Sequence, residues 1–162
     1  MGSKLFVFFC VFGLMLGTTA CTLTITPSAP AQRSANRVIF TAEEAEAYRN
    51  EINAQAAEFW TPADADVAAL ETDLPAFLQT AEHPWLRPSP PIWERVPDYQ
   101  RQYLGILEEG ERVIYANFFC NAHDTDWENE LVFILDGGDC YFQVKYNVES
   151  GEFYDLSVNG EA

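Results

Sequence analysis

The chain has 162 residues and a formal net charge of −16, with 25 acidic residues against 9 Lys and Arg. Because a surface this acidic repels phosphate groups, nucleic acid and anionic lipid headgroups are excluded as partners. The length corresponds to one domain of ordinary size. The acidity is typical of a surface that keeps a protein soluble. The alternative is that it attracts a basic or cationic partner.

The first twenty residues have the three parts of a secretory signal. Lys4 supplies a positive charge, residues 5–16 form an apolar run, and residues 17–20 are small. The apolar run is too short to cross a bilayer comfortably, because a spanning helix needs about 20 residues. We therefore expect residues 1–20 to be a signal peptide that is removed on export, with an uncleaved anchor as the alternative.

Cys21 follows Ala20 at the expected cleavage point. This arrangement resembles the lipobox of bacterial lipoproteins, in which the cysteine after the cut receives a lipid and becomes the mature N-terminus. The resemblance implies that Cys21 carries acyl chains such as palmitate and attaches the protein to the extracytoplasmic side of a membrane. Since the family prefers Leu where this chain has Thr18, secretion as a soluble protein is the alternative.

The segment after Cys21 is rich in Thr, Ser, Pro and Ala up to Asn36 and shows no hydrophobic period. Such a composition cannot bury a core and is typical of a flexible tether. We assign residues 21–38 to the lipidated cysteine and its tether, and residues 39–162 to a single domain.

Helical patterns follow between residues 41 and 81. Thr41 and Glu44 form a capping box, and Pro62 stands where a second helix begins. Pro75 is expected to break or bend this second helix. The apolar positions at helical spacing are Ala45, Tyr48, Ile52, Ala56 and Phe59, followed by Val67, Leu70, Leu74, Phe77, Leu78 and Ala81.

Residues 83–98 contain five prolines and two tryptophans. Proline at this density excludes a helix or a central strand and predicts an extended crossing. We expect this crossing to lie along the domain and to let Trp85 and Trp93 cover the core.

From Tyr99 the hydrophobic period changes to two, which predicts an antiparallel sheet over residues 99–160. The clearest strand begins at Cys140 and ends at Val148, and a hairpin is expected around Gly110. The chain is thus predicted to be α+β, with two N-terminal helices packed on a curved antiparallel sheet of four to five strands. This order of elements is similar to cystatin-like rolls.

Cys120 and Cys140 form an even pair in an exported protein, which favours a disulfide. In a simple meander a strand over residues 131–135 would separate them by about 15 Å. We therefore expect the two flanking strands to pair directly and residues 121–139 to form an excursion. Free cysteines, or a metal site formed with His123, are the alternatives.

Four carboxylates alternate along one loop, at Asp124, Asp126, Glu128 and Glu130. A calcium-binding EF-hand loop needs Gly at its sixth position and Glu at its twelfth, where this chain has Asn129 and Leu135. The pattern therefore predicts a solvated acidic loop and no metal or other cofactor. An irregular calcium site is the alternative.

No residue is assigned a catalytic role. Asp136 and Asp139 flank two glycines that fit a turn, and neither His83 nor His123 has a Ser or Cys nucleophile at a known spacing. A hydrolase that uses acidic residues is the alternative function.

A set of short motifs runs through the C-terminal part of the chain: Arg101-Gln102-Tyr103, Gly105, Asn117-Phe118-Phe119-Cys120, Trp127, Asp136-Gly137-Gly138, Cys140-Tyr141-Phe142 and Val158-Asn159-Gly160. Through these motifs the chain resembles a family of uncharacterised exported bacterial proteins. That resemblance implies the architecture of the domain and no particular activity. Together with the aromatic-rich sheet, it leads us to expect a non-catalytic binding or interaction module of the cell envelope, with a protein or small-ligand partner.

Overall fold

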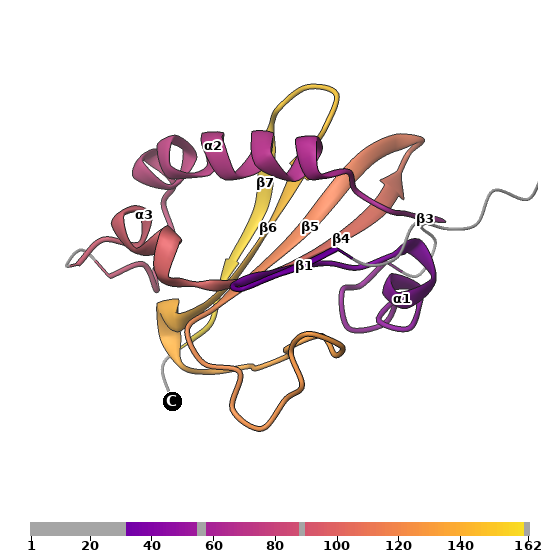
Figure 1. Ribbon diagram of the computed structural model, residues 1–162. Coiled ribbons are helices and arrows are strands. Elements are labelled where there is room, and N and C mark those ends of the chain that lie inside the picture. The colour runs from indigo at the N-terminus through magenta and orange to yellow at the C-terminus, as the bar shows by residue number, and fades with distance from the viewer. Residues whose placement is uncertain (1–31, 55–57, 88–89, 161–162) are drawn as a thin grey trace, which may run out of the picture.

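The computed structural model describes residues 32–54, 58–87 and 90–160. The expected signal peptide, Cys21 and most of the tether lie outside these residues. The described part is an α+β domain with one open, mixed, seven-stranded sheet and few helices (Figure 1). In this part of the chain we find no helix of sufficient length and apolarity to span a membrane.

The centre of the sheet consists of long strands that pair with their chain neighbours in antiparallel order. The first two of these strands bury consecutive side chains and so contribute to both faces of the sheet, whereas buried and partly exposed side chains alternate along most of the third. This part of the sheet agrees with the prediction. The strands are β4 (Gln100–Glu108), β5 (Glu111–Phe119), β6 (Tyr141–Asn147) and β7 (Phe153–Val158).

The outer edge of β4 is shared by two short strands. β2 (Arg37–Ile39) runs parallel to the first half of β4, and β3 (Glu58–Trp60) runs antiparallel to its second half. β1 (Gln32–Ser34) pairs with β2 and forms the edge of the sheet. The sheet is therefore mixed and larger than the predicted antiparallel sheet, because segments expected as tether and helix supply three strands.

The first predicted helix is much shorter than its pattern. α1 (Ala42–Glu46) has the expected capping box, in which the Thr41 hydroxyl accepts from the Glu44 amide and the Glu44 carboxylate accepts from the Thr41 amide. Turns follow, and Phe59 lies in β3, where it pairs with Ile106. Pairing with the open edge of β4 satisfies the backbone here, so the tertiary contact overrides the helical spacing.

The second predicted helix is present as α2 (Asp64–Thr80), and it buries Val67, Leu70, Leu74 and Leu78. Pro75 lies inside α2 without ending it. Of the predicted break or bend, the break was wrong, because the apolar stripe continues on both sides of the proline and packs against the sheet. The bend stays a prediction.

The proline-rich crossing is only partly extended. Its second half contains α3 (Ile92–Arg95) and the 3₁₀ turn η1 (Val96–Asp98), with Pro91 at the N-cap of α3 and no backbone donor lost inside it. Trp93 packs against the core as expected, whereas Trp85 is 45% exposed.

The two faces of the sheet are covered differently (Figure 1). α2 lies across one face, over a core that includes Tyr103, Phe118 and Phe142. The chain between β5 and β6, drawn in orange, lies across the opposite face with α1 beside it. The core of this second face includes Leu104, Val113, Phe119, Leu131 and Val132.

The excursion between Cys120 and Cys140 is confirmed. β5 and β6 pair directly, and the two cysteines form a disulfide with Cα atoms 5.2 Å apart. The Cys120 amide also donates to the Cys140 carbonyl. The alternatives of free cysteines and of a metal site with His123 are thereby excluded, and residues 131–135 form no strand.

Candidate functional site

An open cleft of about 650 Å³ lies on the α1 side of the sheet, at the end where β4 turns into β5. This volume is within the range of small-ligand sites in proteins. Its walls carry carboxylates, amides, one tyrosine and a few apolar side chains, and none of its lining residues is basic. The lining residues are Asn53, Ala54, Leu107, Glu108, Glu109, Glu111, Val113, Asn147, Glu152 and Tyr154.

The β4–β5 hairpin brings three of these carboxylates together. Glu108 and Glu111 are directly paired across the two strands, and Glu109 and Gly110 form the turn with φ of 53° and 88°. Positive φ at both turn residues is the conformation of the tight two-residue turns that connect antiparallel strands. The turn therefore crowds negative charge at the rim of the cleft, at a cost in electrostatic and backbone energy.

Lys145, which does not line the cleft, and Tyr154, which does, hold the lining carboxylate of Glu108 in place. The Lys145 ammonium lies 2.7 Å from a Glu108 oxygen and 3.0 Å from an Asp155 oxygen. The Tyr154 hydroxyl donates to the other Glu108 oxygen over 2.8 Å. Glu108 is thus fixed by two donors, while Glu111 accepts from the Asn147 amide.

The protonation states of these groups suit binding more than acid–base chemistry. Burial opposes the charge of Lys145, but its hydrogen bonds to Glu108 and Asp155 outweigh this effect and raise its pKa. Burial, followed by the hydrogen bond to Glu108, raises the pKa of Tyr154. Both side chains keep their protons at neutral pH, so neither is a ready base.

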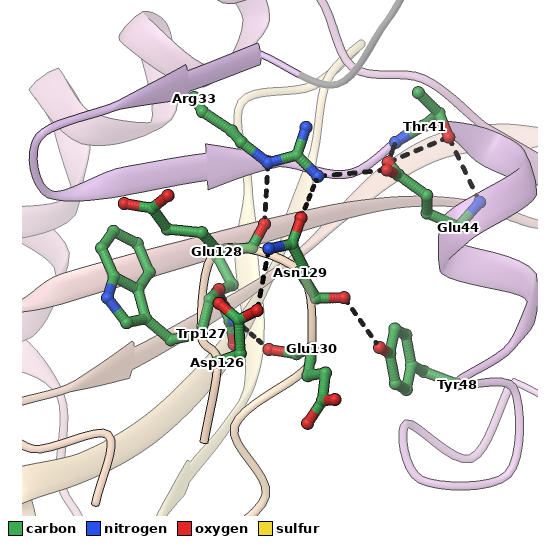
Figure 2. A network of polar contacts seen from close by, with 10 residues as sticks. Arg33, Thr41, Glu44, Tyr48, Asp126, Trp127, Glu128, Asn129 and Glu130 are labelled. Atoms are coloured by element: carbon green, nitrogen blue, oxygen red, sulfur yellow. Dashed lines mark hydrogen bonds and ion pairs between the residues drawn. The ribbon is translucent and has the colours of Figure 1, made fainter. Parts of the chain in front are cut away.

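The predicted acidic loop is organised by an arginine (Figure 2). Arg33 donates from Nε to the Glu128 carbonyl over 2.8 Å and from Nη2 to the Asn129 side chain over 3.2 Å. Arg33 also contacts Glu44, and the Asp126 carboxylate accepts from the Asn129 amide. The guanidinium group of Arg33 thus holds this loop through a main-chain carbonyl and an amide side chain, and not through the carboxylates of the predicted calcium pattern.

No group of three or more His, Cys, Asp or Glu side chains in the described ranges is placed to hold a metal ion. Asp124, Asp126, Glu128 and Glu130 are accordingly not gathered into one ligand set.

The remaining candidate residues have structural contacts. The Asp139 side chain is 3% exposed and accepts from Arg95 over 2.6 Å. The Tyr141 hydroxyl donates to the Asn121 carbonyl and lies 2.8 Å from Nε2 of His123. Because the hydroxyl hydrogen is used by Asn121, Nε2 of His123 is the donor in this pair.

The aromatic residues of the sheet do not form a binding face. Tyr103, Phe119 and Phe142 are fully buried, and Tyr141 and Tyr146 are each 4% exposed. They fill the two cores, so the aromatic pattern that led us to expect a binding surface is explained by packing.

A buried row of amides was missed from the sequence. Gln102, Asn117 and Gln143 lie in register on β4, β5 and β6, and the first two are 0% and 2% exposed. The signal was present, because each is a polar residue inside an otherwise apolar strand. Because the three polar residues occupy paired positions on neighbouring strands, they would together have predicted a polar contact on one face of the sheet.

No family model matches the chain, and neither a curated protein nor a solved structure is significantly similar to it.

Proposed function

We propose that this protein is a non-catalytic binding module of the cell envelope, and that its acidic cleft binds a cationic ligand. The observation that carries the proposal is the lining of the cleft, where Glu109, Glu111 and Glu152 face a volume of about 650 Å³ with no basic residue among the lining. Carboxylates give such a ligand charge complementarity, and Leu107 and Tyr154 give an alkyl chain apolar contact.

The strongly negative net charge supports the same class of ligand, because it attracts a cation from a distance and repels anions. The hydrolase alternative finds less support in the cleft. Both oxygens of the Glu108 carboxylate accept hydrogen bonds, one from Lys145 and one from Tyr154, so this carboxylate is not free to act as a base.

The test is calorimetric titration of the purified protein with the polyamine spermine at low salt. We expect saturable binding that weakens about tenfold in the variant Glu109→Gln, Glu111→Gln, Glu152→Gln, because three ligand-facing charges are lost. The matched control is Glu82→Gln, Glu94→Gln, Asp124→Asn, which removes the same charge from exposed positions elsewhere. Equal weakening in both variants would show attraction to the net charge alone and would overturn the proposal.

We also propose that the protein is exported and anchored by lipid on Cys21, with its domain on the extracytoplasmic side of the membrane. The signal-like residues 1–20 and the lipobox-like position of Cys21 support this location. Intact mass after detergent phase partitioning tests it. A detergent-phase species that starts at Cys21 with acyl mass supports the anchor, and an aqueous species of unmodified mass means ordinary secretion.

The architecture supports one finer comparison. α2 lies across one face of a sheet of long antiparallel strands, and this arrangement is similar to cystatin-like rolls. We propose the likeness for the architecture alone, since a shared fold does not carry a function.

A further inference from the structure

The segment 127–136, which we call the strap, crosses the sheet face opposite α2. Its backbone is held by side chains of the domain, and Figure 2 shows the end near Arg33. Gln102 donates to the carbonyls of residues 127 and 130, both over 2.7 Å, and Asn117 donates to that of residue 132 over 2.8 Å. Strap carbonyls that accept side-chain donors are those of Trp127, Glu128, Asn129, Glu130, Val132, Ile134 and Asp136.

These donors come from separate parts of the fold. Arg33 lies in β1, Tyr48 follows α1, Gln102 and Asn117 lie in β4 and β5, and Asn159 follows β7. Gln102 also accepts from the backbone amide of Val132 over 2.9 Å, so it binds the strap as both donor and acceptor. A row of fixed side chains thus performs the hydrogen bonding that a neighbouring strand performs elsewhere in the sheet.

From Val132 to Leu135 the side chains of the strap alternate between the domain and solvent, and Leu131, which precedes them, is buried as well. Val132 is 3% exposed and Ile134 is partly buried, whereas Phe133 is 51% and Leu135 is 77% exposed. Residues 127–130 form a turn, whereas residues 132–135 have the arrangement of a peptide bound through its main chain with alternate side chains in pockets.

We propose that the sheet face beneath the strap is a groove that binds an extended polypeptide through its backbone, and that the strap is its built-in occupant. The Cys120–Cys140 disulfide fixes the two ends of the excursion, which keeps the strap at high effective concentration over the groove. A second polypeptide with aliphatic residues at the positions of Val132 and Ile134 fits the same face once the strap leaves it. This site is separate from the acidic cleft and does not depend on a ligand there.

The experiment removes the occupant and supplies it in trans. Residues 123–137 are replaced by a short Gly-Ser linker, which leaves Cys120 and Cys140 free to pair, and a fluorescent peptide of residues 126–137 is added. We expect saturable binding by fluorescence anisotropy to this variant and about tenfold weaker binding, or none, to the intact protein, whose own strap competes.

Two altered peptides test how the groove recognises its occupant. The change Phe133→Ser with Leu135→Ser leaves the buried contacts in place, so its affinity should stay within about threefold. Methylation of the Val132 amide nitrogen removes the donor to Gln102 and should weaken binding about tenfold. If both peptides bind equally well, recognition through the backbone is wrong.

The shortened variant tests the proposal whether it is folded or unfolded without the peptide. If it is unfolded, the peptide should restore the native near-ultraviolet circular dichroism during refolding. A folded variant that does not bind the peptide, or an unfolded one that the peptide does not rescue, overturns the proposal.

Discussion

The side chains of Gln102 and Asn117 lie directly opposite each other on β4 and β5, and the Asn117 amide donates to the Gln102 oxygen over 3.0 Å. The same two side chains hold the backbone of the strap, with the amide and carbonyl of Val132 bound between them. Both are buried, so the contact between sheet and strap depends on complete satisfaction of these amides.

The variant Gln102→Leu should lower the free energy of unfolding by about 2–4 kcal/mol. The reason is that buried backbone groups of the strap lose their hydrogen-bond partners. Urea denaturation with the disulfide intact measures the change. Gln143→Leu is the matched control, since Gln143 donates one hydrogen bond to Asn117 and none to the strap. A smaller loss than that of Gln143→Leu would show that the strap is held mainly by its apolar contacts.

Replacement of both Cys120 and Cys140 by Ser should lower the free energy of unfolding by about 3 kcal/mol, because the disulfide closes a loop with a sequence separation of 20. Far-ultraviolet circular dichroism should stay unchanged, since β5 and β6 pair through their own backbones. The measurement is thermal unfolding of the variant beside the oxidised protein. Loss of the sheet signal at low temperature would contradict the expectation.

The variant Glu109→Asn should raise the free energy of unfolding by up to about 1 kcal/mol, because Asn tolerates a φ of 53° better than Glu does. It also removes one of several crowded negative charges. Glu109→Gln separates the two effects, since it removes the charge and keeps the strained side chain. Urea midpoints of the two variants decide between them, and equal gains would assign the whole effect to charge.

Gly105→Ala should destabilise the protein by about 2–3 kcal/mol. A Cβ atom at this position would overlap the Trp60 carbonyl oxygen and lie 2.8 Å from the Trp60 indole ring. Trp60 anchors β3 through its indole hydrogen bond to the Ile106 carbonyl, so the variant should also increase hydrogen exchange of the β3 amides. Exchange that rises equally throughout the sheet would argue against a local clash.

The protein should lose stability in alkaline solution above pH 10.0, the ordinary pKa of tyrosine. Burial raises the pKa of Tyr99 to about 12, so the folded state keeps a proton that the unfolded state releases between these two values. The stabilisation is complete below pH 10.0 and falls as the pH rises toward about 12. The variant Tyr99→Phe should reduce the slope of unfolding free energy against pH in this range, while an unchanged slope would assign the loss to other tyrosines.

The long strands and the disulfide could be predicted because their signals are local or are fixed by geometry. Alternation from Cys140 to Val148 identifies β6, and the reach of a disulfide requires that β5 and β6 pair. α2 was equally visible from its apolar stripe, although Pro75 gave a wrong expectation of a break.

The short strands and the cleft could not be predicted, because their partners are distant in the sequence. β3 has a helical pattern and becomes a strand only because the edge of β4 is open to it. The cleft joins residues 53–54 to the hairpin and to β7, and no spacing rule relates these segments. Trp85 was expected to cover the core from the composition of residues 83–98 alone, yet it is 45% exposed.

The order of the strands in the sheet also sets the order in which the domain can fold. β1, β2 and β3 come first in the chain, but β2 and β3 both depend on β4 for their backbone partners. During synthesis, β2 and β3 therefore lack their backbone partner until β4 has emerged. The β4–β5 hairpin, closed by a two-residue turn, is the nucleus that this topology makes available.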